Sequence, residues 1–274
     1  AEGRTVRTFS SNDKQREEDA RLRIPTYWPR PDKVLPKTKG FHRFQWDLHL
    51  QPISYELVDP EYPIAAVPGA TAPVATSPWV MPGDYTVTLS VNGRKFTETL
   101  TVKMDPRVAI SPAALNRQYQ LSYSLWASRL ALLNEQDALA TLSAELEFFK
   151  KKAGERPVAA EIAELQKRLG ALAGSGPRRP DAPLSFAVIG KLTTLFDALQ
   201  SVDAPPTPIV ESAVAPVIKE AKDALIVWSE IQNSLPTLRK AIAASGLGEL
   251  KLTARRIRPG VIDEDEAKET YTIP

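Results

Sequence analysis

The sequence predicts an α+β chain of two domains, with an N-terminal Ig-like or fibronectin-like antiparallel β-sandwich followed by an antiparallel four-helix-type bundle. Residues 83–104 alternate apolar and polar side chains on either side of Asn92-Gly93, which is the pattern of a β-hairpin with a type I′ turn. Residues 112–153 contain neither proline nor glycine and carry leucines at helical spacing. We therefore expect three segments: an Ig-like sandwich (1–108), a helical bundle (109–248) and a charged C-terminal tail (249–274).

The hairpin is expected to form half of the sandwich core, because alternate side chains of a strand share one face of its sheet. The threonines of both strands would then face outward. The residues expected on the buried face are Tyr85, Val87, Leu89, Val91, Phe96, Leu100, Val102 and Met104.

Two further strands are expected before the hairpin, a short one over residues 5–9 and a longer one over residues 41–50. In the longer strand, His42 falls in the apolar register and His49 in the polar register, so a regular strand would point the only two histidines to opposite faces. They would not share a metal ion. The apolar side of this strand is predicted to carry Phe44, Trp46, Leu48 and Leu50, and the polar side Arg43, Gln45, Asp47 and His49.

A long proline-rich connection over residues 51–82 is the first candidate for binding a partner, because loops of this length are uncommon in compact domains. An equally weighted interpretation is that it only covers a sheet edge. The proline-spaced segment at residues 24–31 is read mainly as a strap that packs an aromatic ring over the sandwich. The aromatic candidates for partner binding are Trp28, Tyr55, Tyr62 and Trp79.

The second half of the chain is predicted to be helical. Ser111-Pro112 forms an N-cap and first helical residue, and residues 112–153 make either one long helix or two with a break near residue 134. Pro216 should kink the fourth helix or mark a false start. The later helices are expected at residues 157–172, 183–202 and 207–232, with a short fifth after Ser234 that closes at Gly246.

The tail carries a basic block followed by the acidic residues 263–266. Blocks of opposite charge so close together usually belong to a solvated tail, and docking onto a partner is the alternative. The basic candidates for partner binding are Arg255, Arg256 and Arg258.

The composition points away from catalysis. The chain has 35 basic and 33 acidic residues, which argues against attraction to nucleic acid by overall charge. It has no cysteine and 2 histidines, so few residues could form a catalytic triad or a metal site. No phosphate-binding, zinc-protease or calcium-loop motif occurs in the sequence. We expect no enzyme activity, no cofactor, no metal and no transmembrane segment.

Several short motifs resemble one bacterial family in order and spacing. The sequence is similar to the C-terminal region of secreted proteins with sortilin-like or sialidase-like BNR β-propellers, often labelled glycosyl hydrolases, over most of residues 1–247. The matching motifs are Gly3-Arg4-Thr5-Val6-Arg7, Gly40-Phe41-His42-Arg43-Phe44-Gln45-Trp46-Asp47-Leu48, Tyr62-Pro63-Ile64, Pro82-Gly83-Asp84-Tyr85-Thr86-Val87, Asp105-Pro106-Arg107-Val108, Gln118-Tyr119-Gln120-Leu121 and Asp203-Ala204-Pro205-Pro206-Thr207-Pro208 ahead of a helix bearing Trp228.

The resemblance implies an Ig-like domain plus helical bundle without the propeller, so no catalytic residue carries over. With the start at Ala1, it suggests a processed C-terminal fragment that acts outside the cytoplasm, in the periplasm or cell exterior, as a non-catalytic structural or interaction module. One alternative is a stabilising subunit on the periplasmic face of a large membrane complex, such as a photosynthetic or respiratory one. A second is a carbohydrate-binding accessory domain of a glycosyl hydrolase, which would need Trp28, Tyr55 and Trp79 exposed on one face.

Overall fold

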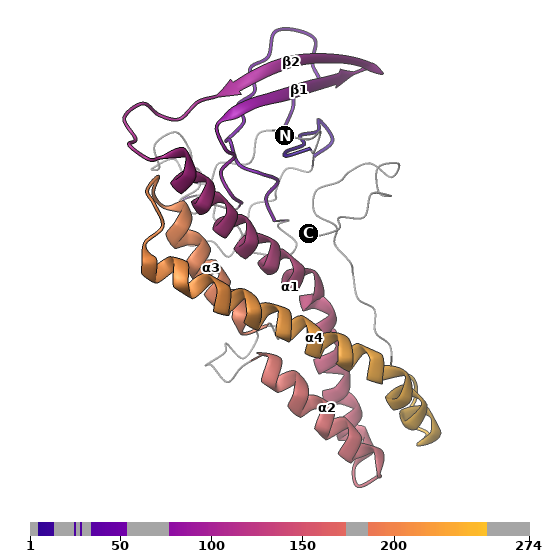
Figure 1. The fold of residues 1–274 in the computed structure, drawn as a ribbon. Helices are drawn as coiled ribbons and strands as arrows, with labels where there is room; N and C mark the ends of the chain where they lie inside the picture. The colour runs from indigo at the N-terminus through magenta and orange to yellow at the C-terminus, as the bar shows by residue number, and fades with distance from the viewer. Residues whose placement is uncertain are drawn as a thin grey trace.

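A computed structural model of the chain describes residues 5–13, 25, 28, 34–53, 77–173 and 186–250. Four helices make up the elongated part of the molecule, and a two-stranded hairpin lies at one end of it (Figure 1). The N-terminal segments described here lie close to the hairpin.

Helix α1 (Pro112–Ala153) is a single uninterrupted helix of 42 residues. The side chain of Ser111 caps its first turn by accepting a hydrogen bond from the backbone N–H of Ala114, and Pro112 occupies the first turn, as expected. Three lysines precede its end at Gly154, where the backbone φ is 57°. The helix spans about 63 Å at 1.5 Å per residue, so it runs the length of the bundle.

The other helices are α2 (Val158–Ala173), α3 (Val188–Gln200) and α4 (Pro208–Ala244). Helices α1 and α4 run in the same direction, while α2 and α3 follow one another in the opposite direction along them (Figure 1). Where α2 and α3 meet, the backbone N–H of Ala187 donates to the carbonyl of Leu172. Helices α2 and α3 therefore lie end to end beside α1 and α4, and both of them contact these two helices.

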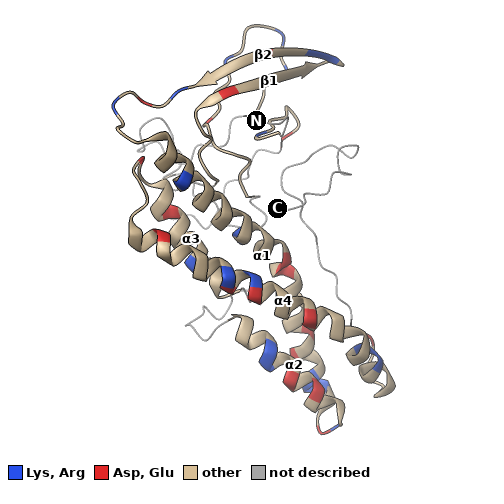
Figure 2. Ribbon diagram, in the orientation of Figure 1, with Lys and Arg blue, Asp and Glu red and all other residues tan. Residues whose placement is uncertain are grey.

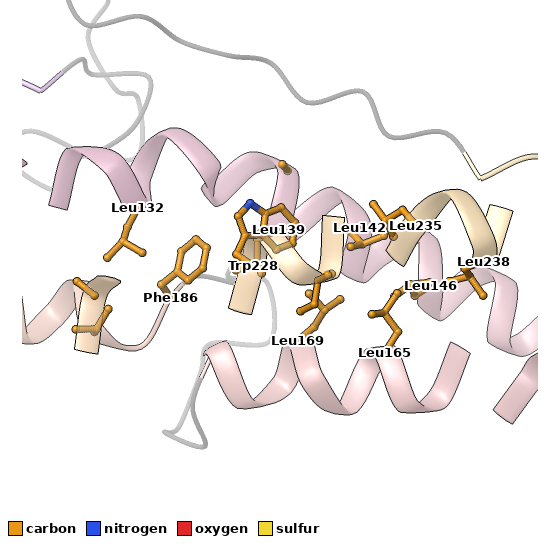
Figure 3. Close-up of a cluster of buried hydrophobic side chains, with 14 of the residues drawn as sticks. Leu132, Leu139, Leu142, Leu146, Leu165, Leu169, Phe186, Trp228, Leu235 and Leu238 are labelled. Carbon is orange, nitrogen blue, oxygen red and sulfur yellow. The ribbon is translucent and has the colours of Figure 1, made fainter. Parts of the chain in front are cut away.

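The core of the bundle is a continuous strip rich in leucine that also buries the aromatic rings of Phe149, Phe186, Phe196 and Trp228. Figure 3 shows side chains of α1, α2 and α4 converging on it, with Trp228 and Phe186 near its centre. Trp228 is buried, and its indole Nε1 donates a 2.9 Å hydrogen bond to Oε2 of Glu135. The labelled leucines in this strip are Leu132, Leu139, Leu142, Leu146, Leu165, Leu169, Leu235 and Leu238.

Helix α4 continues through both of its prolines, Pro216 and Pro236. The predicted end near residue 232 and the separate fifth helix are therefore wrong. A proline removes one backbone hydrogen bond and crowds the preceding turn. Here, Leu235 and Leu238 flank the second proline and are buried in the core, so packing holds the helix together across it.

The predicted β-sandwich is wrong over the residues that the structure describes. These residues form one sheet of two antiparallel strands, β1 (Gly83–Val91) and β2 (Arg94–Val102). Residues 5–9 form no strand. Residues 41–50 contribute only an isolated bridge between His49 and Trp79, and Leu48 has a φ of 60°, which breaks the extended run.

Burial along residues 43–50 nevertheless follows most of the expected two-sided pattern: Phe44, Trp46 and Leu48 are partly buried and Leu50 is buried, while Arg43, Gln45 and Asp47 are exposed. His49, placed on the polar side, is the exception, because it is buried. The backbone of this segment instead makes scattered bonds, from Leu50 N–H to the carbonyl of Pro78 and from Gln51 N–H to that of Val6. It is an irregular strap rather than a sheet strand.

Candidate interaction surface

The hairpin has the register that the sequence predicts. Asn92 and Gly93 both adopt positive φ, at 49° and 76°, as a type I′ turn requires. Leu89 lies opposite Phe96, and Tyr85 lies opposite Leu100. The expected apolar residues therefore share one face, and this part of the prediction is confirmed.

The distal part of that face is not buried, contrary to the prediction. The reason is that neither strand packs along a helix, and among the described elements each strand neighbours only the other. We call these side chains the apolar hairpin face: Val87 is 46% exposed, Leu89 50%, Val91 45%, Phe96 55% and Leu100 40%.

The base of the hairpin is covered. The ring of Trp46 meets that of Tyr85 edge-on, with centroids 5.6 Å apart. The phenol of Tyr85 donates a 2.5 Å hydrogen bond to the carbonyl of Met81, and burial raises the pKa of this phenol, with a smaller contribution from nearby Tyr119. The covered base gives the exposed distal part a defined position.

Two charged residues interrupt the apolar hairpin face. Glu98 lies opposite Val87, and Arg94 lies opposite Val91 at the turn end. Neither forms an ion pair with another described residue. The face is thus an apolar surface with one anion and one cation four residues apart on β2.

The reverse face of the hairpin is polar, as predicted. Thr101 donates through its hydroxyl to Oδ1 of Asp84 at 2.6 Å. The other side chains on this face are Thr86, Thr88, Ser90, Lys95, Thr97 and Thr99. Because the two faces differ in polarity, a substitution on the polar face can serve as the control for a substitution on the apolar face.

Of the residues singled out from the sequence, the structure describes Trp28 and Trp79. Trp79 is 41% exposed, but its ring stacks against that of His49 with centroids 3.8 Å apart. Trp28 is partly buried, and its backbone N–H donates to the carbonyl of Pro25. The other candidates, with most of the 51–82 loop, lie outside the described residues: Tyr55, Tyr62, Arg255, Arg256 and Arg258.

A small polar network joins Trp79 to the bundle. Its backbone N–H donates to Oε1 of Gln200 in α3 at 2.9 Å, and Nε2 of Gln200 donates to the hydroxyl of Ser122 in α1 at 2.9 Å. Beside it, Nδ1 of His49 lies 2.5 Å from the carbonyl oxygen of Ser77. Burial lowers the pKa of His49, outweighing this hydrogen bond and the nearby carboxylate of Asp47. These bonds attach the segment around Trp79 to α1 and α3.

The helices offer few other candidates. An open groove of about 510 Å³ lies between α3 and α4, lined mainly by small and aliphatic side chains such as Gly190 and Ala213, with the ion pair of Lys191 and Glu220 beside it at 2.8 Å. Acidic and basic residues are interspersed along the helices that the structure describes (Figure 2).

Within the described ranges, no group of three histidine or acidic side chains is placed to hold a metal ion. The helices there also include none that is long and apolar enough to cross a membrane.

Sequence reasoning missed the apolar hairpin face as a site, because alternation of this kind ordinarily marks a strand that is buried on one side. The interruption of that alternation by Glu98 was the available signal, since an acid in the middle of a core-facing stripe is unusual. Comparison of the chain with protein-family models, with curated proteins and with solved structures finds no match.

Proposed function

We propose that this chain is a non-catalytic protein-binding module whose docking surface is the apolar hairpin face. The observation that carries the proposal is the contiguous exposure of Val87, Leu89, Val91, Phe96 and Leu100 on one side of the hairpin. Exposed apolar side chains occurring singly are ordinary, whereas a contiguous group marks a contact surface.

The shape of the surface favours a sheet as its occupant. The face is pleated, and side chains from two sheets interdigitate when the sheets pack about 10 Å apart. An isolated two-stranded hairpin is marginally stable in water, so a covering sheet also stabilises the hairpin itself. Fully burying a leucine or phenylalanine contributes about 1.5–3 kcal/mol. Leu89 and Phe96, already half covered, would each contribute about half of that amount.

The energy of such a contact comes mainly from the central pair. Leu89 and Phe96 lie opposite one another and are the most exposed of the five side chains. Large apolar side chains at the centre of a contact carry most of its energy, while the surrounding residues exclude water. A lysine at position 89 should therefore abolish docking without disturbing the bundle, which the hairpin strands do not pack along.

The experiment compares Leu89→Lys with Thr88→Lys, which adds the same charge to the polar face. Each variant is expressed in the native host, and the size of the particle that carries it is measured without denaturant. We expect the wild-type chain and Thr88→Lys to travel in a particle larger than 30.2 kDa, and Leu89→Lys to travel alone. Equal behaviour of the two variants would show that the apolar hairpin face is not the docking surface.

A photo-crosslinking residue at position 89, with position 88 as its control, provides a second readout. We expect a protein crosslink from position 89 only. Crosslinks from both positions, or from neither, would contradict the proposal.

A further inference from the structure

We infer that the sheet covering the apolar hairpin face is the same face of a second copy of this chain, so that two copies form a symmetric dimer. This inference rests on the proposed function, since it names the occupant of that surface. It is argued from the positions of Glu98 and Arg94 and from the part of the hairpin that the described residues leave uncovered.

Three cross-strand pairs form the uncovered part of the face. They are Val87 with Glu98, Leu89 with Phe96, and Val91 with Arg94. In the pair below them, Trp46 covers Tyr85 and only Leu100 is exposed, so the three pairs above it are the ones open on both strands. The Leu89–Phe96 pair is consequently the centre of the available surface, with the acidic pair on one side and the basic pair on the other.

The two charges decide which surface can cover this face. An apolar partner would bury the carboxylate of Glu98 and the guanidinium of Arg94 without counter-charges, and the penalty for an unpaired buried ion is several kcal/mol. The covering surface must therefore present a cation opposite Glu98 and an anion opposite Arg94, with apolar side chains between them. The chain's own hairpin has that arrangement in reverse order along β2.

One twofold axis brings the charges together. The axis lies midway between the two sheets, runs across the strands and passes through the Leu89–Phe96 pair. It reverses the strand direction, so Arg94 of each copy lies over Glu98 of the other. Phe96 of one copy then packs against Phe96 of the other at the centre. Together the two side chains span the sheet separation of about 10 Å.

The other in-plane twofold axis, parallel to the strands, is disfavoured. It places Glu98 of each copy over Val87 and close to the other Glu98, and it leaves Arg94 near Arg94. Like charges juxtaposed in a contact cost several kcal/mol. The charges therefore select the first axis and make each face complementary to itself, as a closed twofold dimer requires.

The contact involves few residues, so its area is smaller than the roughly 1,200–2,000 Å² of stable protein interfaces. We therefore expect a dimer that dissociates on dilution. Both reciprocal pairs are needed, and reversing the charge of one residue replaces both attractions with repulsions.

The test measures self-association of the purified chain by sedimentation equilibrium across a dilution series. The variants are Arg94→Glu, Glu98→Arg and the double exchange, and Lys95→Glu on the polar face is the control. We expect each single exchange to weaken the dimer at least about tenfold, which corresponds to about 1.4 kcal/mol. The double exchange should restore it, and the control should leave it unchanged.

A mixing experiment separates charge pairing from misfolding. Arg94→Glu carries two acids on its face and Glu98→Arg carries two bases, so each is expected to be monomeric alone and the equimolar mixture to be dimeric. A wild-type chain that stays monomeric at every concentration, or a mixture that stays monomeric, would overturn the second copy as occupant. If Leu89→Lys still releases the native particle in that case, the face binds a different protein and the proposed function stands; if it does not, both proposals fail.

Discussion

Trp46 packs edge-on against Tyr85 with ring centroids 5.6 Å apart, and its indole Nε1 also donates a 2.9 Å hydrogen bond to the carbonyl of His49. The Trp46 side chain thus joins the base of the hairpin to residue His49, whose backbone pairs with Trp79. This contact explains why only the distal part of the hairpin is exposed.

Replacing Trp46 with leucine should loosen the hairpin base, because both the ring contact and the indole donor are lost. We expect a cost of about 1–3 kcal/mol in the local opening free energy, seen as faster amide hydrogen exchange in β1. Trp46→Phe keeps a ring against Tyr85 and should cost less. Equal exchange rates in the wild type and in Trp46→Leu would contradict this role.

Replacing Trp228 with phenylalanine should destabilise the bundle by about 2–3 kcal/mol, because the partly buried Glu135 loses a charged hydrogen bond and some packing volume is removed from the core. Urea unfolding followed by circular dichroism measures the change. Glu135→Gln retains an acceptor for the indole and should cost less. A Trp228→Phe variant as stable as the wild type would show that this bond has no net effect.

Gln200 is predicted to control how firmly the segment around Trp79 is attached to the bundle. Gln200→Leu removes the acceptor for the Trp79 N–H, so this amide should exchange faster with solvent, by about tenfold for a loss of 1.4 kcal/mol. Gln200→Glu keeps the acceptor and loses the donor to Ser122, so protection of the Trp79 amide should be retained. Unchanged protection in the leucine variant would contradict the attachment.

Stability should fall as the pH drops below the usual histidine pKa of 6.5, because burial lowers the pKa of His49 in the folded chain. The unfolded chain then binds a proton that the folded chain does not, so the free energy of unfolding declines by up to about 1.4 kcal/mol per pH unit. The two charged residues near His49 have opposite effects on its pKa: Asp47 raises it by favouring the charged imidazole, and Arg7 lowers it.

His49→Phe provides the control for this titration, because it keeps an aromatic ring against Trp79 and removes the ionisable group. Its unfolding free energy should change less than that of the wild type between about pH 7.5 and pH 5.5, where histidine titrates. Parallel pH profiles for the two proteins would show that the loss of stability arises elsewhere.

Local features of the fold were predictable from short stretches of sequence. The Ser111-Pro112 cap, the Asn92-Gly93 turn and the helical spacing of α2 each depend on residues close together in the chain. Backbone geometry and side-chain periodicity determine such features before any distant contact forms. The shared apolar face of β1 and β2 follows from the same turn.

The sequence by itself thus determined which hairpin residues share a face, and only the tertiary structure decided that no described element covers this face. Alternation specifies the direction of a side chain but not the presence of an opposing sheet. Leu48, turned to positive φ, and Pro236, held within α4 by buried leucines on both sides, were likewise settled by distant contacts. Burial depends on which elements contact one another in space, and a local sequence pattern does not predict those contacts.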